Sequence, residues 1–172
     1  MSTSKLVNLA LLITFAVVIH TIEAFIPVPL PVPGAKLGLA NIITLLVLYF
    51  YDLKSGITVA IIRSVLGSMF AGNFLSFGFF FSLSGAFLST LVMAAFLPLE
   101  RREKISVISV SMLGAVGHNT AQVITAAFFI SNFYLIAMYL PILLLLALPT
   151  GIFTGFAAFY LIKNLRKTFP TV

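Results

Sequence analysis

The sequence predicts an all-α integral membrane protein that forms one six-helix transmembrane domain over residues 1–172. Hydrophobic residues make up 61% of the chain, charged residues only 8%, and the mean hydropathy is +1.19. Because soluble domains carry about 25% charged residues, lipid is the expected solvent for most of this chain. At roughly 20 apolar residues per spanning helix, the length accommodates about six helices joined by short loops.

The first apolar run, Leu6–Ile26, predicts a transmembrane helix rather than a removable leader peptide. It contains His20 and Glu23, it lacks a small-residue cleavage site, and several further apolar runs follow it. His20 and Glu23 are three residues apart, so a helix places both side chains on one face.

The stretch that follows, Pro27–Asn41, is a proline-rich segment between the first two predicted helices, and the predicted binding site depends on it. It reads PVPLPVPGAKLGLAN, with a proline at every second position from Pro27 to Pro33. Proline fixes φ and removes amide donors, so we expect a stiff, polyproline-like segment, and Gly34 then permits a turn. We interpret the stretch as a rigid cap at one membrane face; a proline-rich linker between two helices is the alternative.

The second span, Gly38–Tyr51, is too short to cross a bilayer by itself. At about 1.5 Å rise per residue it falls well short of a hydrocarbon core of roughly 30 Å. The proline-rich stretch must therefore dip into the protein to supply the missing thickness. Non-helical backbone survives at that depth only where it is buried against protein or lines a cavity. This argument predicts a binding cavity beneath the cap.

The remaining helices are predicted from apolar runs and from the cap residue and prolines that begin or interrupt them. Asp52 is a candidate N-cap for the third span. Pro98 is expected to end the fourth span, and Pro141 and Pro149 to break the sixth. The predicted spans are Leu53–Gly72, Leu75–Leu97, Ile105–Ile130 and Phe133–Leu161, with a charged loop at Leu99–Lys104.

Basic residues at the ends of the spans are distributed very unequally between the two sides of the membrane. One side holds only Lys36, and the other holds Lys5, Lys54, Arg101, Arg102, Lys104, Lys163, Arg166 and Lys167. Because basic residues concentrate on the cytoplasmic side, both termini are predicted to be cytoplasmic and the cap to face outside. The same distribution accounts for the net charge of +6, so we expect no nucleic-acid partner.

The fifth span carries a stripe of polar side chains. Its members recur every three or four residues, which places them on one helix face, and they are Ser111, Gly114, His118, Gln122 and Thr125, with Asn119 beside them. Lipid cannot satisfy such groups, so they face protein or a cavity. Interhelical hydrogen bonds are one interpretation. Substrate contact is the other, and the density of His118, Asn119 and Gln122 favours it.

Arg63 lies at the middle of the third span with no partner nearby in sequence. An unpaired arginine at that depth is very costly, so it requires an anion. We expect a structural pair with Glu23, and an anionic group of the substrate is the alternative.

Motifs for catalysis are absent from the sequence. It has no G-x-x-x-x-G-K-[ST] phosphate loop, and its only aspartate is Asp52. With no cysteine and two histidines, no metal site is predicted, and no serine stands in a recognisable nucleophile arrangement. We therefore expect no enzyme activity, and any coupling to ATP would need a partner.

Three motifs carry a resemblance to a known family. PVPGAKLGLANIITLLVLY, IIRSVLGSMFAGN and SVSMLGAVGHNTAQ resemble a bacterial membrane family labelled heptaprenyl diphosphate synthase component I or Gx transporter. That family is similar in layout to the substrate-binding S-components of energy-coupling-factor (ECF) vitamin transporters. The resemblance implies a bacterial cytoplasmic membrane location and a six-helix bundle. It maps Pro33, Gly34, Lys36 and Asn41 to the cap, and His118, Asn119 and Gln122 to a signature of the fifth helix.

The leading hypothesis is a substrate-binding membrane subunit, similar to an ECF S-component, for uptake of a small organic molecule. The resemblance favours a flavin, a quinone precursor or a prenyl compound as that molecule. It also implies a transmembrane coupling protein and cytoplasmic ATPases as partners, although the first span lacks an A-x-x-x-A docking pattern. The alternative is a non-catalytic membrane subunit of a prenyl diphosphate or quinone pathway, or of an electron-transfer assembly. The candidate substrate-binding residues are His20, Glu23, Gly34, Lys36, Asn41, Arg63, His118, Asn119 and Gln122.

Overall fold

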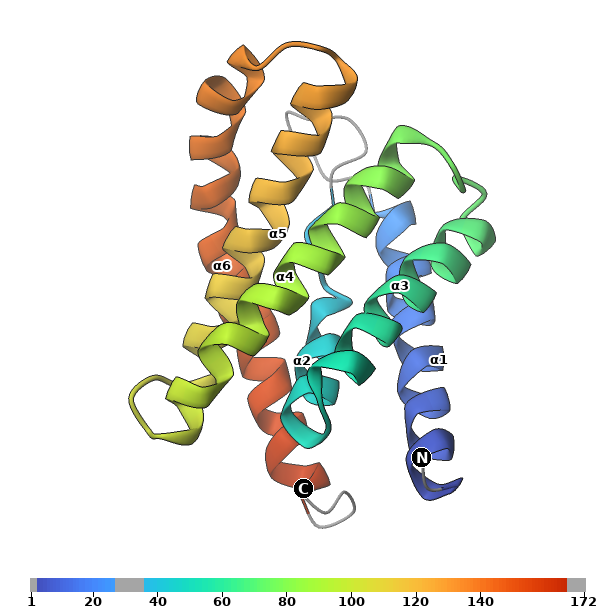
Figure 1. The fold of residues 1–172 in the computed structure, drawn as a ribbon, viewed down its shortest axis with the longest axis vertical. Helices are drawn as coiled ribbons and strands as arrows, with labels where there is room; N and C mark the ends of the chain where they lie inside the picture. The colour runs from blue at the N-terminus through green and yellow to red at the C-terminus, as the bar shows by residue number, and fades with distance from the viewer. Residues whose placement is uncertain (1–2, 27–35, 167–172) are drawn as a thin grey trace.

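The computed structural model describes residues 3–26 and 36–166, and in that part of the chain every regular element is a helix (Figure 1). Five of these helices are long and apolar enough to cross a membrane, and the second is short. The predicted all-α membrane fold is confirmed. The helices are α1 (Thr3–Phe25), α2 (Asn41–Phe50), α3 (Leu53–Phe70), α4 (Phe77–Arg101), α5 (Val107–Phe129) and α6 (Tyr134–Leu165). The cap prolines and Gly34 lie outside the described residues.

Helix α2 forms the centre of the bundle. All of its residues except Ile42 are buried, and it contacts each of the other five helices. A helix that is apolar on nearly every side can be packed on all sides without burying many unsatisfied polar groups. It begins at Asn41 rather than at the predicted Gly38, because Gly38 has a φ of +82°, which a right-handed helix does not allow. The Asn41 amide still bonds to the Gly38 carbonyl at 2.9 Å, which closes the turn before the helix.

Close backbone contacts hold α5 against α6. A Cβ atom added at Gly151 would lie 2.6 Å from Cα of Met112, and one at Gly155 would lie 2.8 Å from Cα of Ile108. Neither distance is compatible with a side chain. Lipid supplies no hydrophobic drive for helix association, so this close packing is what stabilises the pair.

Helix α1 packs at one side of the bundle against α3 and α2 (Figure 1). The contact with α3 is close at Gly67, where an added Cβ would lie 2.5 Å from Cδ2 of His20. The inward face of α1 therefore carries His20 and Glu23 into the protein, as their shared face predicted.

Side-chain caps begin three of the helices. The predicted N-cap at Asp52 is confirmed, since its carboxylate accepts a hydrogen bond from the Ser55 amide at 2.8 Å. Ser76 and Ser106 cap α4 and α5 in the same way, although the sequence analysis placed both starts at other residues.

The proline positions require two corrections. Helix α4 continues through Pro98 to Arg101, and α6 is continuous from Tyr134 to Leu165 with Pro141 and Pro149 inside it. Each proline removes one backbone hydrogen bond, whereas a break within the membrane would expose several polar groups to lipid. Continuing the helix is therefore the less costly arrangement.

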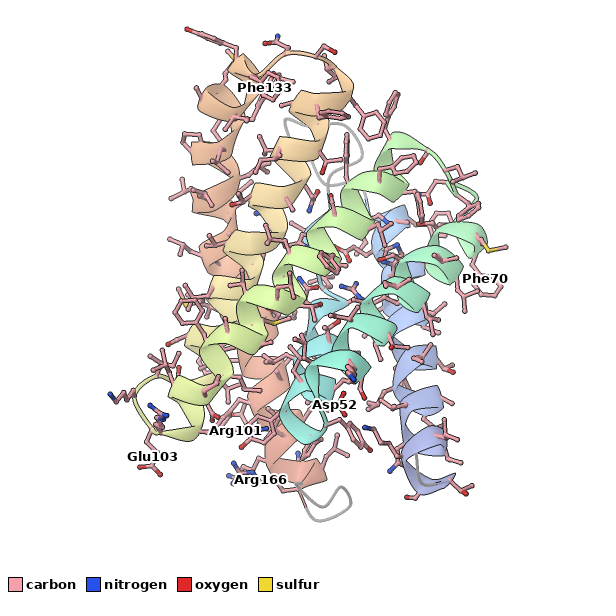
Figure 2. The ribbon with its side chains drawn as sticks, in the orientation of Figure 1. Asp52, Phe70, Arg101, Glu103, Phe133 and Arg166 are labelled. Atoms are coloured by element: carbon pink, nitrogen blue, oxygen red, sulfur yellow. The ribbon has the colours of Figure 1, made fainter. Side chains whose placement is uncertain are left out.

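The predicted sidedness of the basic residues matches the arrangement of the helices. The first turn of α1, the end of α6 and the turns after α2 and α4 lie at one end of the molecule (Figure 1). Asp52, Arg101, Glu103 and Arg166 are at that end, and Phe133 is at the other (Figure 2). Which end faces the cytoplasm stays a prediction.

Candidate functional site

Polar side chains from several helices surround the short non-helical segment that enters the bundle before α2. This segment comprises residues 36–40, and the candidate residues around it are at most 8% exposed. We define the inner polar cluster as the members that gather here: His20 and Glu23 from α1, Lys36, Asn41 at the start of α2, Arg63 from α3, and His118 and Gln122 from α5. Their convergence depends on how α1, α2, α3 and α5 pack against one another, which no spacing in the sequence reveals.

The oxygen and the nitrogen of the Gln122 side-chain amide each form a hydrogen bond with the backbone of Lys36. The Lys36 amide donates to Oε1 at 2.9 Å, and Nε2 donates to the Lys36 carbonyl at 2.9 Å. This arrangement satisfies a non-helical peptide group in the interior, which otherwise costs several kcal/mol in lipid.

Side chains of α1 hold the same segment from the opposite side. The Glu23 carboxylate accepts a hydrogen bond from the Gly38 amide at 2.5 Å. Nζ of Lys36 lies 2.9 Å from Nε2 of His20, and the ammonium donates to that ring nitrogen. Lys36 and Gly38 are thus held by side chains of α1 and α5.

The expected direct ion pair between Arg63 and Glu23 is wrong. Nη2 of Arg63 donates to Oδ1 of Asn41 at 2.6 Å, and among the described residues the ion pair within 4.0 Å is Lys5–Asp52. Glu23 instead accepts a hydrogen bond from the Gly38 amide, which lies before the first turn of α2 and takes no part in a helical hydrogen bond. Arg63 and Glu23 remain close enough to interact electrostatically.

His118 occupies a gap between two glycines. An added Cβ at Gly85 would lie 2.8 Å from the ring, and one at Gly38 would lie 3.2 Å from it. The residue is 2% exposed, yet neither ring nitrogen has a hydrogen-bond partner of normal geometry among the described residues. Apart from hydroxyl groups, the other buried side-chain atoms in that condition are Nε of Arg63 and Oδ1 of Asn73.

Other members of the polar stripe on α5 point away from the inner polar cluster. Asn119 donates to the Leu143 carbonyl of α6 at 2.7 Å. Ser111 bonds to Thr154 of α6 at 2.9 Å, and Thr125 bonds to Ser84 of α4 at 2.8 Å. For these residues the structure provides interhelical hydrogen bonds, whereas His118 and Gln122 face the segment 36–40.

Glycine residues complete the site in a way that sequence reasoning missed. Gly38 supplies the amide that engages Glu23, and Gly85 and Gly67 make room for the two histidine rings. Gly85 is one of four small residues at helical spacing on α4, with Gly78, Ser82 and Ser89, and this spacing was the available signal.

A groove on the lipid-facing side lies apart from the inner polar cluster. It has a volume of about 600 Å³ and is lined by residues of α1 and α3 that include Thr14, Val18, Leu66 and Phe70. No member of the inner polar cluster lines it. The groove is almost wholly apolar, so it offers little for the recognition of a polar solute.

Comparison with models of protein families shows which family the chain belongs to. The family model described as heptaprenyl diphosphate synthase component I matches residues 12–161. The chain belongs to this family. The match spans the whole inner polar cluster, and it confirms the resemblance carried by the three motifs. Searches for similar curated proteins and for similar solved structures gave no match.

Membership in the component I family has a direct consequence for partners. A component implies a second subunit in a synthase complex, and the helices of this chain make it the membrane-bound part. The likeness in layout to ECF S-components stays a prediction.

Proposed function

We propose that this component I protein binds a small organic molecule within the membrane and serves as the substrate-binding subunit for its uptake. The observation that supports this proposal is His118, a fully buried imidazole whose two nitrogens have no partner of normal geometry among the described residues. A buried polar group left unsatisfied costs roughly 1–3 kcal/mol, so such a group is retained where it serves a function.

The surroundings of His118 support binding rather than catalysis. The inner polar cluster combines donors and acceptors from α1, α3 and α5 around a chain segment that is not held by helical hydrogen bonds. Ligands of transporters are commonly held near interrupted helical backbone of this kind.

An energising partner is part of the proposal. The chain has no phosphate-binding loop, so active uptake would need a transmembrane coupling protein and cytoplasmic ATPases. The nearest matches on α1 to an A-x-x-x-A docking pattern are Ala16 with His20, which are buried, and Ala10 with Thr14, which are exposed. The exposed pair is the one available to a partner helix.

Mass spectrometry of the purified chain tests the binding function. We expect a small molecule to be released when the wild-type protein is denatured, and to be lost from His118→Phe. Thr120→Val is the matched control and should retain the molecule, because the Thr120 hydroxyl donates to the Val116 carbonyl of its own helix. A wild-type chain that releases nothing, from cells grown in rich medium, would contradict the proposal.

A second candidate function is favoured by the family match. The chain would be the non-catalytic membrane subunit that holds a prenyl diphosphate synthase at the bilayer. Its basic end, which includes Arg101 and Arg166, provides a surface for an acidic soluble subunit (Figure 2). A stable complex with such a synthase, formed by a chain that releases no small molecule, would favour this candidate over uptake.

A further inference from the structure

The inner polar cluster contains more positive than negative charge. Arg63 is 1% exposed and Lys36 is 8% exposed, and both carry a positive charge in their ordinary protonation states. The side-chain carboxylates of the whole sequence are Glu23, Asp52, Glu100 and Glu103. Asp52 and Glu103 lie at the far end of the molecule (Figure 2), and Glu100 is in the last turn of α4 beside Arg101. Glu23 is therefore the one carboxylate available to two buried cations.

Within residues 3–26 and 36–166, neither cation has a charged partner at hydrogen-bond distance. Arg63 bonds to the neutral amide of Asn41, and Lys36 bonds to the ring of His20. Glu23 is occupied by the Gly38 amide. An uncompensated charge buried in a membrane protein is very costly, and it is usually neutralised by a partner of opposite sign.

Two unpartnered groups in the cluster can donate to such a partner. Nε of Arg63 is a donor only, and it has no acceptor among the described residues. At least one ring nitrogen of His118 carries a hydrogen in any protonation state, and the contact of the ring with the Gly85 backbone does not reach hydrogen-bond geometry. Both groups can therefore donate to an oxygen atom of a ligand, and negatively charged oxygens accept the stronger hydrogen bonds.

We propose that the inner polar cluster binds the anionic group, a carboxylate or a phosphate, of a small organic molecule through Arg63, Lys36 and His118. This inference rests on the proposed binding function and specifies the class of substrate. The anion would neutralise the excess charge and accept from Nε of Arg63 and from the His118 ring. Asn41 and Gln122 keep the arginine and the segment 36–40 in place.

The variant Asn41→Asp tests the charge balance without any ligand. It replaces the amide oxygen 2.6 Å from Nη2 of Arg63 with a carboxylate of nearly the same shape. We expect a higher Tm for the ligand-free variant than for ligand-free wild type, because the new carboxylate supplies the missing negative charge. An unchanged or lower Tm would overturn the inference. Inorganic phosphate and acetate, each titrated at constant ionic strength, should raise the Tm of wild type and not that of Asn41→Asp.

Mass spectrometry of molecules released on denaturation provides the second test. We expect wild type and Lys54→Gln, a control at an exposed basic position, to release the same acidic molecule. Arg63→Gln and Asn41→Asp should release at least tenfold less of it; if Arg63→Gln does not fold, Asn41→Asp alone decides. A released molecule without an acidic group, or equal retention by Asn41→Asp, overturns the anion inference and leaves the binding function standing. If wild type releases nothing, the binding function fails, and the Tm of Asn41→Asp still tests the charge balance.

Discussion

Gln122 and Lys36 lie 86 positions apart in the sequence, yet the Gln122 amide pairs with both backbone polar atoms of Lys36 at 2.9 Å. The contact joins α5 to the segment that leads into α2. It resembles one rung of a β-ladder, with a side chain in place of the second strand. Gln122, which the sequence analysis predicted to contact substrate, thus supports the backbone of the segment before α2.

Replacing Gln122 should destabilise the whole protein. Gln122→Leu leaves the amide and carbonyl of Lys36 without partners in the interior, at a cost on the order of 2–4 kcal/mol. Thermal unfolding in detergent or nanodiscs measures the loss. Thr120→Val, which removes a bond within the same helix, should cost less. Equal stability of the two variants would show that Gln122 does not support the segment.

A methyl group at position 85 should disturb His118. The Cβ of Gly85→Ala would lie 2.8 Å from Cε1 and Nδ1 of the ring, and overpacking of this kind typically costs about 1–3 kcal/mol. His118→Ala should relieve the clash, so the double variant should be more stable than additivity predicts. Unfolding measurements on the two single variants and the double variant check this coupling. Strict additivity would mean that the ring moves aside freely.

The contact between α1 and the turn after α2 should respond to acid. The hydrogen bond from Lys5, together with the Ser55 amide, lowers the pKa of Asp52 from 3.8 to about 2. Because the folded-state pKa is the lower one, this contribution is present above pH 3.8 and is lost as the pH falls through about 2. The pair is partly exposed, so the effect on stability should be below about 1 kcal/mol.

The variant Lys5→Met removes the ion pair with Asp52 but leaves the helix cap at Asp52 intact, so it distinguishes the two contributions to stability. We expect its Tm to be slightly below that of wild type at neutral pH, and the difference to shrink towards zero near pH 2. A difference that stays constant across this range would assign the effect to the packing of the Lys5 side chain.

The orientation in the membrane can be measured with single cysteines, since the chain has none of its own. Phe133 lies at the end opposite the basic residues, and Glu103 lies among them (Figure 2). We expect Phe133→Cys to react with an impermeant thiol reagent in intact cells, and Glu103→Cys only after lysis. The reverse pattern would place both termini outside.

Much of the site was visible in the sequence as separate residues. A charged or polar group within an apolar run stands out because lipid cannot solvate it, so His20, Glu23, Arg63, His118 and Gln122 were identified one by one. Their partners were not, because hydrogen bonds between distant segments depend on helix placement. Glu23 illustrates this: the expected partner was a guanidinium, and the observed one is the amide of Gly38.

By itself, the sequence determined that this protein is a helical membrane bundle with a short second helix and basic residues gathered at one end. These features follow from composition and the position of charges along the chain, which act locally. Only the tertiary structure decided that residues 36–40 enter the interior between α1 and α5, that Arg63 bonds to Asn41, and that His118 lies against Gly38 and Gly85. Those outcomes depend on which helix faces pack against each other. Small residues on several faces allow many pairings of similar energy, and only the packing of the whole bundle selects among them.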